Sequence, residues 1–317
     1  MSPYADQRAD HAQRQPVDPS TAGNGLSIKE AARFLGVPGP TLRSWERRYG
    51  LPSTSRSVGG HRRYRSGDLV QLSLMRDEIA IGRRAGDAAR WVRGLLDEAN
   101  PEIARIHAML EASTRLDAGA IRSVLDRANA EIGLVATLDS VLLPAMRQVG
   151  AWWETGECDV GQEHFTTEVV RGWLAKVITL TPSPKAATTP VLLATGPDDF
   201  HTLGLEALAA QLAQEGLPSR LLGPRTSQRA LLAATAATPG AVVVVVSHLS
   251  THRRSAVASL RAVAESSAPA FFAGNAFMFP AARKGVPGTY LGESIGEAAL
   301  LIAAAGPSRS TSVSAQR

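Results

Sequence analysis

The chain has 317 residues, of which 44% are hydrophobic and 20% charged, and its formal net charge is +5. These values are ordinary for a soluble globular protein, and the length predicts two or three domains with cores of their own. The single cysteine, Cys158, excludes a disulfide framework within one chain and fits a reducing, cytoplasmic setting. We expect neither a signal peptide nor a membrane span, because the amino terminus is polar and no later stretch is apolar enough.

The first ordered segment is predicted to be a helix, a short turn and a second helix. Ser27 and Glu30 form a capping-box pattern, and the apolar residues that follow share one helical face until Gly36. Thr41 is predicted to cap a second helix over residues 42–49. This arrangement is typical of DNA-binding proteins, in which the second helix lies in the major groove.

Basic residues concentrate in this segment. Residues 27–65 contain nine Lys or Arg and two Glu, a net +7 against +5 for the whole chain. Such a block neutralises phosphates, which favours DNA binding over a simple helical hairpin. The sequence from Gly59 to Tyr64 is typical of a wing, a tight turn that carries arginines to the DNA backbone or minor groove.

The motifs SIKEAA at 27–32, TLRSWERRYGLP at 41–52 and GHRRY at 60–64 resemble the winged-helix DNA reader of the MerR family. The resemblance implies a DNA-binding domain over residues 26–98 and binding to inverted repeats as a dimer. It implies DNA contacts from the second helix and the wing, through Thr41, Arg43, Arg47, Arg48, Tyr49, His61, Arg62, Arg63 and Tyr64. Trp45 is expected in the core instead. The helical pattern after residue 68 lacks a long heptad run, so dimerisation through other surfaces is expected.

Residues 101–180 are helical in pattern throughout, after a break at Asn100-Pro101. Apolar periodicity marks four helices, the second of which begins near Asp117. Four helices of this length predict an antiparallel four-helix bundle. Between the last two helices, residues 151–164 gather two tryptophans, several acids and a histidine. From the residues alone, one tryptophan in the core, solvated acids and Asp159 as a helix cap also explain this segment.

The rest of the chain alternates strands with helices. Residues 181–190 are a Pro-rich linker, and strands are predicted at 191–194, 219–222, 241–246, 270–273 and 289–291. This alternation over residues 191–305 predicts a flavodoxin-like (Rossmann-type) parallel sheet. The whole is therefore a multidomain α and α/β protein. Residues 1–25 and 306–317 are polar and without periodicity, so both are expected to be disordered tails.

Candidate ligand-binding residues follow three of these strands. Asp199 and His201 lie after the first strand, at the sheet edge where α/β folds bind ligands. A histidine there can ligate a metal while the aspartate accepts its other N–H. Gly204 allows a large group to approach. His248 and His252 follow a later strand: simple exposure is one interpretation of His248, and His252 is expected on a solvated face.

Asp-x-His-x-x-Gly at 199–204 resembles the signature of cobalamin-binding domains of the methionine synthase and mutase type. The resemblance implies that His201 is the lower ligand of cobalt. Ser247 and Leu249 match the Ser-x-Leu of that signature, and Gly274 matches the first glycine of its Gly-Gly, with Asn275 in place of the second.

Trp153, followed after nine residues by Glu163 and His164, resembles the Trp-x9-Glu-His motif of the CarH/LitR-type photoreceptor regulators. The resemblance implies that a four-helix bundle covers the upper face of adenosylcobalamin, with these three residues against the adenosyl group. It implies a dark tetramer that represses at operator DNA, a smaller species after light breaks the cobalt–carbon bond, and no enzymatic turnover. Where the best-known members have a histidine after the tryptophan, this chain has Glu154, so water, His164 or no ligand remain alternatives for the lit state.

Two other classes are weighed against this one. A corrinoid carrier of a methyltransferase also joins a helical bundle to a cobalamin fold, but it has no need of the basic segment at 27–65. A MerR-type regulator that senses another ligand or a redox state remains the alternative, and the presence of Asp199, His201 and Ser247 argues against it.

Overall fold

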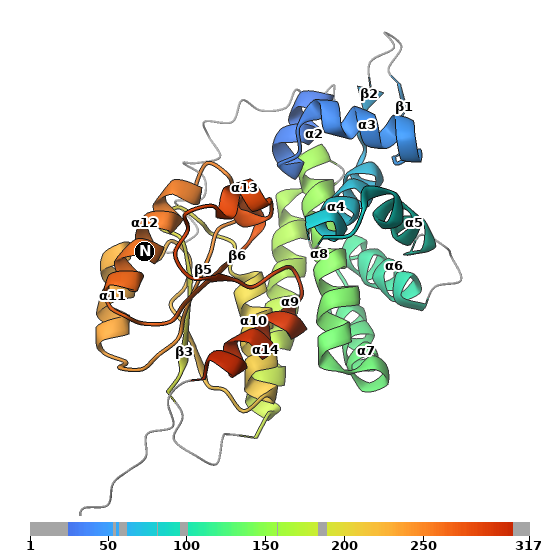
Figure 1. Ribbon diagram of the computed structural model, residues 1–317. Coiled ribbons are helices and arrows are strands. Elements are labelled where there is room, and N and C mark those ends of the chain that lie inside the picture. Colours follow the sequence, from blue (N-terminus) through green and yellow to red (C-terminus); the bar gives the residue numbers. More distant parts are fainter. Residues whose placement is uncertain are drawn as a thin grey trace, which may run out of the picture.

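The computed structural model describes residues 25–52, 55–56, 62–80, 82–95, 101–156, 158–182 and 189–306. Three units follow one another along the chain: a small helical unit, here the reader, then a helical bundle and an α/β unit (Figure 1). Outside the described residues lie almost all of the two expected tails, the wing residue His61 and most of the Pro-rich linker.

The reader has the helix-turn-helix order that the sequence predicts. Its elements are α2 (Ile28–Leu35), α3 (Gly39–Tyr49), the antiparallel pair β1 (Ser55–Arg56) and β2 (Arg62–Arg63), α4 (Ser66–Ala80) and α5 (Ala85–Leu95). The capping box of Ser27 and Glu30 is confirmed. The prediction that Thr41 caps α3 is wrong, because the helix begins at Gly39 after Pro38. Pro40 fits this first turn, since its fixed φ is helical and its missing N–H is not needed there.

The bundle contains α6 (Pro101–Thr114), α7 (Ala118–Thr137), a π-helical segment (Leu138–Leu142), α8 (Leu143–Thr155) and α9 (Val160–Leu180). Gly133 has φ 79° and ψ 168°, which interrupts α7, so the run contains two separate helices. The four-helix prediction is therefore confirmed. Asp117 and Asp159 cap their helices by accepting the backbone N–H of Ala120 at 2.9 Å and of Gln162 at 2.8 Å.

The sequence-based expectation that no stretch approaches a membrane span needs correction. The helical run Ala118–Glu154 is long and apolar enough to pass that test, and half of its most apolar window is buried in the protein. The break at Gly133 and the packing of this run in the bundle explain the composition. These residues are apolar because they form a core.

The α/β unit is built on a five-stranded parallel sheet of order β4-β3-β5-β6-β7. This is the flavodoxin-like order, as predicted. The strands are β3 (Val191–Thr195), β4 (Ser219–Leu221), β5 (Val243–Val246), β6 (Ala270–Ala273) and β7 (Thr289–Tyr290). The helices are α10 (Leu203–Gln214), α11 (Gln228–Ala236), α12 (Arg253–Glu265), the 3-10 turn Asn275–Phe277, α13 (Pro280–Arg283) and α14 (Ile295–Ala305).

The two faces of this sheet pack against different partners. Successive strand residues point to opposite faces. Leu193 and Val244 belong to a core shared with α10, α14 and the bundle, whereas Leu192 and Val243 pack toward α11 and α12. The bundle is therefore packed on one helical layer of the α/β unit (Figure 1).

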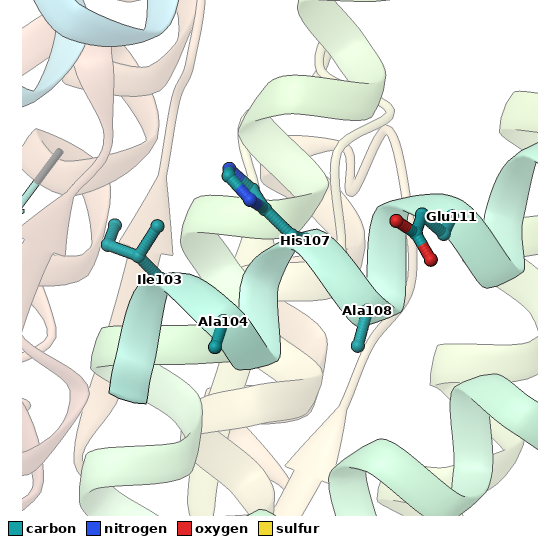
Figure 2. Close-up of a pocket in the computed structure, with 5 residues that line it drawn as sticks. All are labelled: Ile103, Ala104, His107, Ala108 and Glu111. Carbon is teal, nitrogen blue, oxygen red and sulfur yellow. The ribbon is translucent and has the colours of Figure 1, made fainter. Parts of the chain in front are cut away.

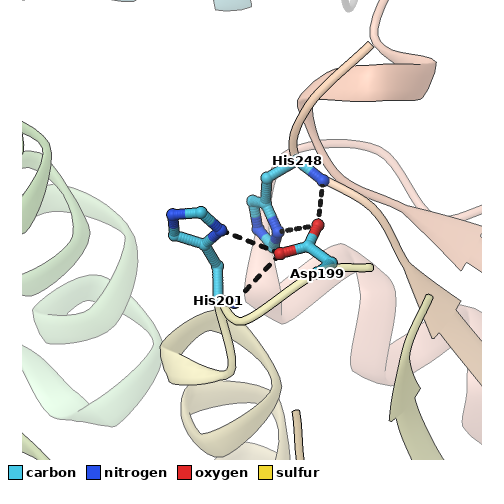
Figure 3. Close-up of side chains that lie close together, drawn as sticks. All are labelled: Asp199, His201 and His248. Atoms are coloured by element: carbon cyan, nitrogen blue, oxygen red, sulfur yellow. Dashed lines mark hydrogen bonds and ion pairs between the residues drawn. The ribbon is translucent and has the colours of Figure 1, made fainter. Parts of the chain in front are cut away.

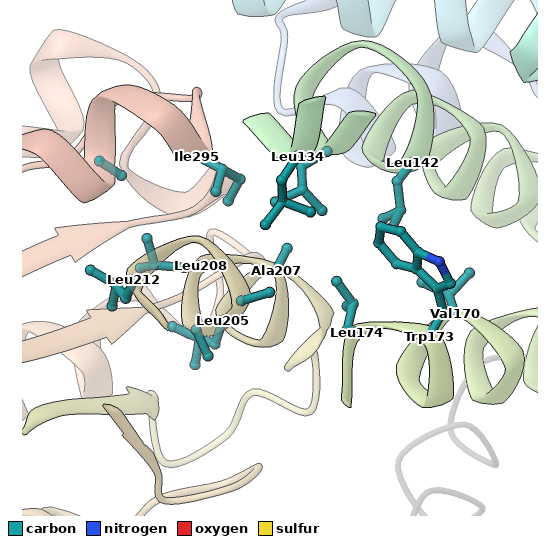
Figure 4. Packing of buried hydrophobic residues seen from close by; sticks show 14 of the residues in the cluster. Leu134, Leu142, Val170, Trp173, Leu174, Leu205, Ala207, Leu208, Leu212 and Ile295 are labelled. Atoms are coloured by element: carbon teal, nitrogen blue, oxygen red, sulfur yellow. The ribbon is translucent and has the colours of Figure 1, made fainter. Parts of the chain in front are cut away.

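The bundle and the α/β unit share one apolar core. Figure 4 shows Leu134 and Leu174 of the bundle facing Ala207 and Leu208 of α10. Asp139 adds a polar contact: its carboxylate accepts the Ser294 hydroxyl at 2.8 Å and the Ile295 N–H at 2.8 Å, which caps α14 from the bundle.

The reader meets the other two units through a charge cluster, here the junction (Arg76, Asp77, Arg147 and Glu293). Arg76 is buried and donates from Nε to Asp77 at 2.8 Å and from Nη1 to the Leu35 carbonyl at 3.0 Å. The other oxygen of Asp77 pairs with Arg147 of the bundle. Burial raises the pKa of Glu293 in the α/β unit, and the nearby Asp77 raises this pKa further. The junction thus gathers side chains from all three units.

Candidate functional site

Asp199 organises the loop between β3 and α10. Its side chain is fully buried, although the loop lies at the carboxyl edge of the sheet. One oxygen, Oδ1, accepts the backbone N–H of His201 at 2.9 Å and the ring Nδ1 of His201 at 2.8 Å (Figure 3). A carboxylate oxygen can only accept, so Nδ1 of His201 carries the proton. Nε2 is then the nitrogen with the lone pair that a metal requires.

The second oxygen of Asp199 is held by His248. Oδ2 accepts the backbone N–H of His248 at 2.5 Å and its ring Nδ1 at 3.2 Å (Figure 3). The two imidazole rings lie 5.2 Å apart, measured between centroids. His248 is not simply exposed, since its side chain is 26% exposed and bonded to Asp199, whereas that of His201 is 61% exposed. His252 lies at the start of α12, and its Nδ1 is buried, so it is not simply solvated either.

Two opposed effects set the charge of Asp199. Burial raises the pKa of this carboxyl group, and hydrogen bonds from His201 and His248 lower it by more, so the net pKa is well below the usual range. Asp199 is therefore ionised at neutral pH. An ionised carboxylate on Nδ1–H increases the electron density of the imidazole and fixes its orientation, as metal-binding histidines require.

Two neighbouring features fit a large ligand with a polar tail. The hydroxyl of Ser247 is fully buried and has no hydrogen-bond partner among the described residues. A methyl group added at Gly204 would meet no described atom within 4 Å, so the space over this turn is open. The residues present thus supply a ligating imidazole, an unpaired buried hydroxyl and room for a bulky group.

Gly274 is required by close packing beside Ser247. Its φ is 98°, and a Cβ added there would lie 2.3 Å from the Ser247 carbonyl oxygen. Asn275, which replaces the second glycine of the signature, begins the following 3-10 turn and is exposed. Leu249 is half-buried just after His248.

The upper-face residues lie on the bundle. Trp153 is half-buried near the end of α8. Glu163 and His164 lie in the first turn of α9, with the Glu163 carboxylate 3.5 Å from Nε2 of His164. The structure thus brings Glu163 and His164 together in the bundle, and Asp199, His201 and His248 together in the α/β unit. Figure 3 shows the ring of His201 directed toward the side of the bundle helices.

Most of the described residues expected to contact DNA are at least partly accessible. Arg43, Arg47 and Arg48 are exposed on α3, Thr41 and Tyr49 are half-buried there, and Arg62 and Arg63 are half-buried on β2. Tyr64 is a correction: its side chain is fully buried, because the backbone of Tyr64 pairs with Leu26 and turns the ring into the reader core. Trp45 is 6% exposed, so its predicted place in the core is confirmed.

Comparison with known proteins agrees with both halves of this picture. The model of the MerR family regulatory protein matches residues 27–64, and that of the B12 binding domain matches residues 105–178. The chain is 31% identical over 212 residues to the HTH-type transcriptional repressor CarH of Myxococcus xanthus, covering 62% of this chain and 70% of that protein. It is 32% identical over 213 residues to the repressor CarA of the same organism, covering 65% and 70%.

The chain belongs to the CarH and CarA family of transcriptional regulators. This chain joins a MerR-type segment to a B12-binding segment, so it is a MerR-type transcriptional regulator with a cobalamin-binding domain. Among solved structures, the monomethylamine corrinoid protein of Methanosarcina barkeri is similar with a TM-score of 0.47 and 15% identity, over 62% of this chain and 96% of that one. That likeness is too low to carry a functional conclusion.

Sequence reasoning missed the residues that connect the two halves of this regulator. Arg171 of α9 donates from Nε to both oxygens of Glu206 at 3.0 Å and from Nη2 to the Thr202 hydroxyl at 3.2 Å. Thr202 directly follows His201 in the chain. Glu206 was the available signal for this contact. It lies in the first turn of α10, among apolar residues that are buried, and a buried carboxylate needs a partner.

Two hollows on the described part of the surface lie away from the predicted ligand residues. One lies along α6 and is lined by Ile103, Ala104, His107, Ala108 and Glu111 (Figure 2). A second is bordered by α7, α9 and the start of the linker. Neither includes Asp199 or His201.

Proposed function

We propose that this regulator is a light-responsive repressor that binds adenosylcobalamin in the dark through His201. The observation that carries the proposal is the Asp199–His201 pair, an ionised carboxylate that orients an exposed imidazole toward the bundle side. When bound, adenosylcobalamin supplies a cobalt–carbon bond that light breaks.

In this proposal each group of residues has its own task. His201 ligates cobalt through Nε2, and Asp199 fixes that ring. Ser247, Leu249, Gly204 and Gly274 surround the nucleotide tail. The buried unpaired hydroxyl of Ser247 supports this role.

The bundle is proposed to cover the upper face. Trp153 packs against the adenosyl group, and Glu163 and His164 hydrogen-bond to it. Helix α9 supports this arrangement, because it carries Glu163 and His164 in its first turn and Arg171 against Thr202 and Glu206. Arg171 lies seven positions after His164, which is about 10 Å along the helix. The same helix therefore contacts the loop of the lower ligand and carries the residues proposed for the upper face.

The output is proposed to be a change of assembly. The ligand-filled protein forms a tetramer that binds operator DNA through Arg43, Arg47, Arg48 and the wing, and light yields a smaller species that releases DNA. A ligand shifts such an equilibrium only by its differential affinity for the two states. We further propose that residues 26–98, 101–180 and 191–305 are separate domains, with 181–190 as a linker.

Absorbance spectroscopy tests the cofactor. Purified protein is mixed with adenosylcobalamin in the dark, freed of unbound ligand, and measured before and after green light. We expect a retained cobalamin spectrum that changes irreversibly on illumination. His201→Ala should alter the dark spectrum, whereas the matched His107→Ala, on the α6 hollow, should not. A protein that retains no cobalamin would contradict the proposal and leave a regulator of another ligand.

Gel filtration and DNA binding test the output. We expect a larger species and operator binding in the dark, with loss of both after light. Glu154, in place of the family histidine, makes the lit state informative: a water-ligated cobalamin spectrum would indicate that no side chain replaces the adenosyl group. Equal DNA affinity in the dark and the light would contradict the light response while leaving cobalamin binding intact.

A further inference from the structure

We propose that His248 is a positioning residue for the cobalt ligand: it holds Asp199 so that Asp199 can orient His201. The inference rests on the proposed cobalamin site. His248 occupies the variable position between Ser247 and Leu249, so no part of the Asp-x-His-x-x-Gly or Ser-x-Leu pattern assigns it a role.

The hydrogen bonds of Asp199 divide evenly between two loops. Oδ1 takes both of its N–H donors from His201, and Oδ2 takes both of its donors from His248. Each loop therefore supplies one backbone N–H and one ring N–H. The carboxylate is therefore held by four donors from two loops, and loss of either ring removes one of the two donors from one oxygen.

The fold explains why a residue 47 positions after His201 reaches the same carboxylate. Strands β3 and β5 are neighbours in the sheet, and Thr195 pairs with Val246 in register. Their carboxyl ends open into the two loops side by side. His248 is the second residue after β5, and the fully buried Ser247 separates it from the strand.

His248 also satisfies a buried charge. Loss of its ring leaves Oδ2 of the fully buried Asp199 carboxylate without a side-chain donor, so the carboxylate is held less firmly and orients His201 less well. Removal of such an outer hydrogen-bond partner typically weakens metal affinity by 10- to 100-fold.

The test compares His248→Leu, His248→Asn and His248→Gln with the wild-type full-length protein. The Asn amide nitrogen occupies the place of the imidazole Nδ1 and can donate to Oδ2, whereas the Gln amide lies one bond farther out. His252→Leu is the matched control from the start of the neighbouring helix. Each protein is loaded with cobalamin, reduced to cobalt(II), and examined by electron paramagnetic resonance, in which one bound imidazole nitrogen splits each cobalt line into three.

We expect His248→Leu and His248→Gln to bind cobalamin about 10-fold more weakly and to lose part of the nitrogen splitting. His248→Asn should restore both, and His252→Leu should match the wild type. If His248 only supported the fold, its variants would lose thermal stability, and Asn and Gln would not differ in cobalamin affinity or nitrogen splitting. The comparison of these two amide variants therefore tests the inference even if His248→Leu folds poorly.

Three results would overturn the inference. Wild-type affinity and splitting in His248→Leu would show that His248 does not act on the ligand. Equal losses in the Asn and Gln variants would show that donation to Oδ2 is not the cause. Nitrogen splitting that persists in His201→Ala and vanishes in the double variant with His248→Ala would make His248 a ligand itself. Wild-type protein that binds no cobalamin would instead overturn the proposed function and this inference with it.

Discussion

The bundle makes two contacts of different character, one with the α/β unit and one with the reader. Toward the α/β unit, Leu134 and Leu174 join a continuous apolar core with α10 and α14 (Figure 4). Toward the reader, α8 packs along α4, the buried Ala151 of α8 enters the reader core, and Arg147 pairs with Asp77 at the junction. Burial holds the first contact, and charge contributes much of the second.

This difference separates sensing from output. Apolar burial scales with area and is insensitive to salt, whereas ion pairs are screened by salt and depend on geometry. The bundle and the α/β unit, here the sensor, are therefore held together mainly by burial. The reader is attached by the packing of α4 on α8 together with the ion pairs of the junction. Four predictions test this difference, from the largest expected effect to the smallest.

Leu174→Ala should destabilise the sensor most. Leu174 is 1% exposed and lies between the bundle and α10, so truncation removes buried apolar surface and leaves a cavity. We expect a loss of about 3 kcal/mol in the free energy of unfolding, measured by urea denaturation. Leu180→Ala on the same helix, where the side chain is 70% exposed, should change it by less than about 0.5 kcal/mol. Equal effects would mean that burial does not hold this contact.

Asp77→Asn should act on the reader contact alone. The change leaves the buried Arg76 guanidinium without its anion, so we expect a cost of about 2–3 kcal/mol in calorimetry, confined to the reader transition. High salt should shrink the difference between wild type and variant. Asp87→Asn, which alters an exposed ion pair with Arg90, is the control and should be neutral. A matching loss of cobalamin affinity would contradict the separation of sensor and reader.

Glu293 makes the junction between the reader and the other two units sensitive to pH. Its pKa is raised above the ordinary value of 4.5 by burial and by Asp77, so folding favours the protonated form. The contribution of the protonated group is complete below pH 4.5 and is lost as pH rises through the folded-state pKa. We expect the melting temperature of the reader transition to fall as pH rises through that window. In Glu293→Gln, the part of this fall that comes from Glu293 should be absent. A Gln variant with an unchanged pH profile would exclude this group.

Asp139→Ala should have the smallest effect. Loss of the cap on α14 should cost about 1 kcal/mol, as should loss of the Asp117 cap within the bundle. Asp139 differs from Asp117 because it caps a helix of another unit. Only Asp139→Ala should therefore increase hydrogen exchange at the first amides of α14. Equal exchange in both variants would show that the apolar core alone fixes this helix.

Local pattern predicted the elements well, and the contacts between units poorly. The five strands, the four bundle helices and the caps at Ser27, Asp117 and Asp159 follow from periodicity and capping chemistry. Thr41 failed as a cap because a proline beside it was equally able to begin the helix. Pairing between distant segments, such as Asp77 with Arg147, has no local signature in a single sequence.

The candidate site divides in the same way. Asp199 and His201 are two residues apart, so a short motif reveals them. His248 and Arg171 reach the same loop only after the sheet and the bundle have formed. Sequence alone assigned no role to His248 and did not single out Arg171. Tyr64 shows the opposite error, since its place in a basic wing motif concealed a side chain that belongs to the core.

Helix α9 has a mechanical consequence. It has 21 residues, which makes it about 30 Å long, and Arg171 ties it near its midpoint to Thr202 and Glu206. The buried residues Val170, Trp173 and Leu174 hold the same stretch in the apolar core. A stiff rod held in this way keeps the turn of Glu163 and His164 and the end at Leu180 in one rigid body.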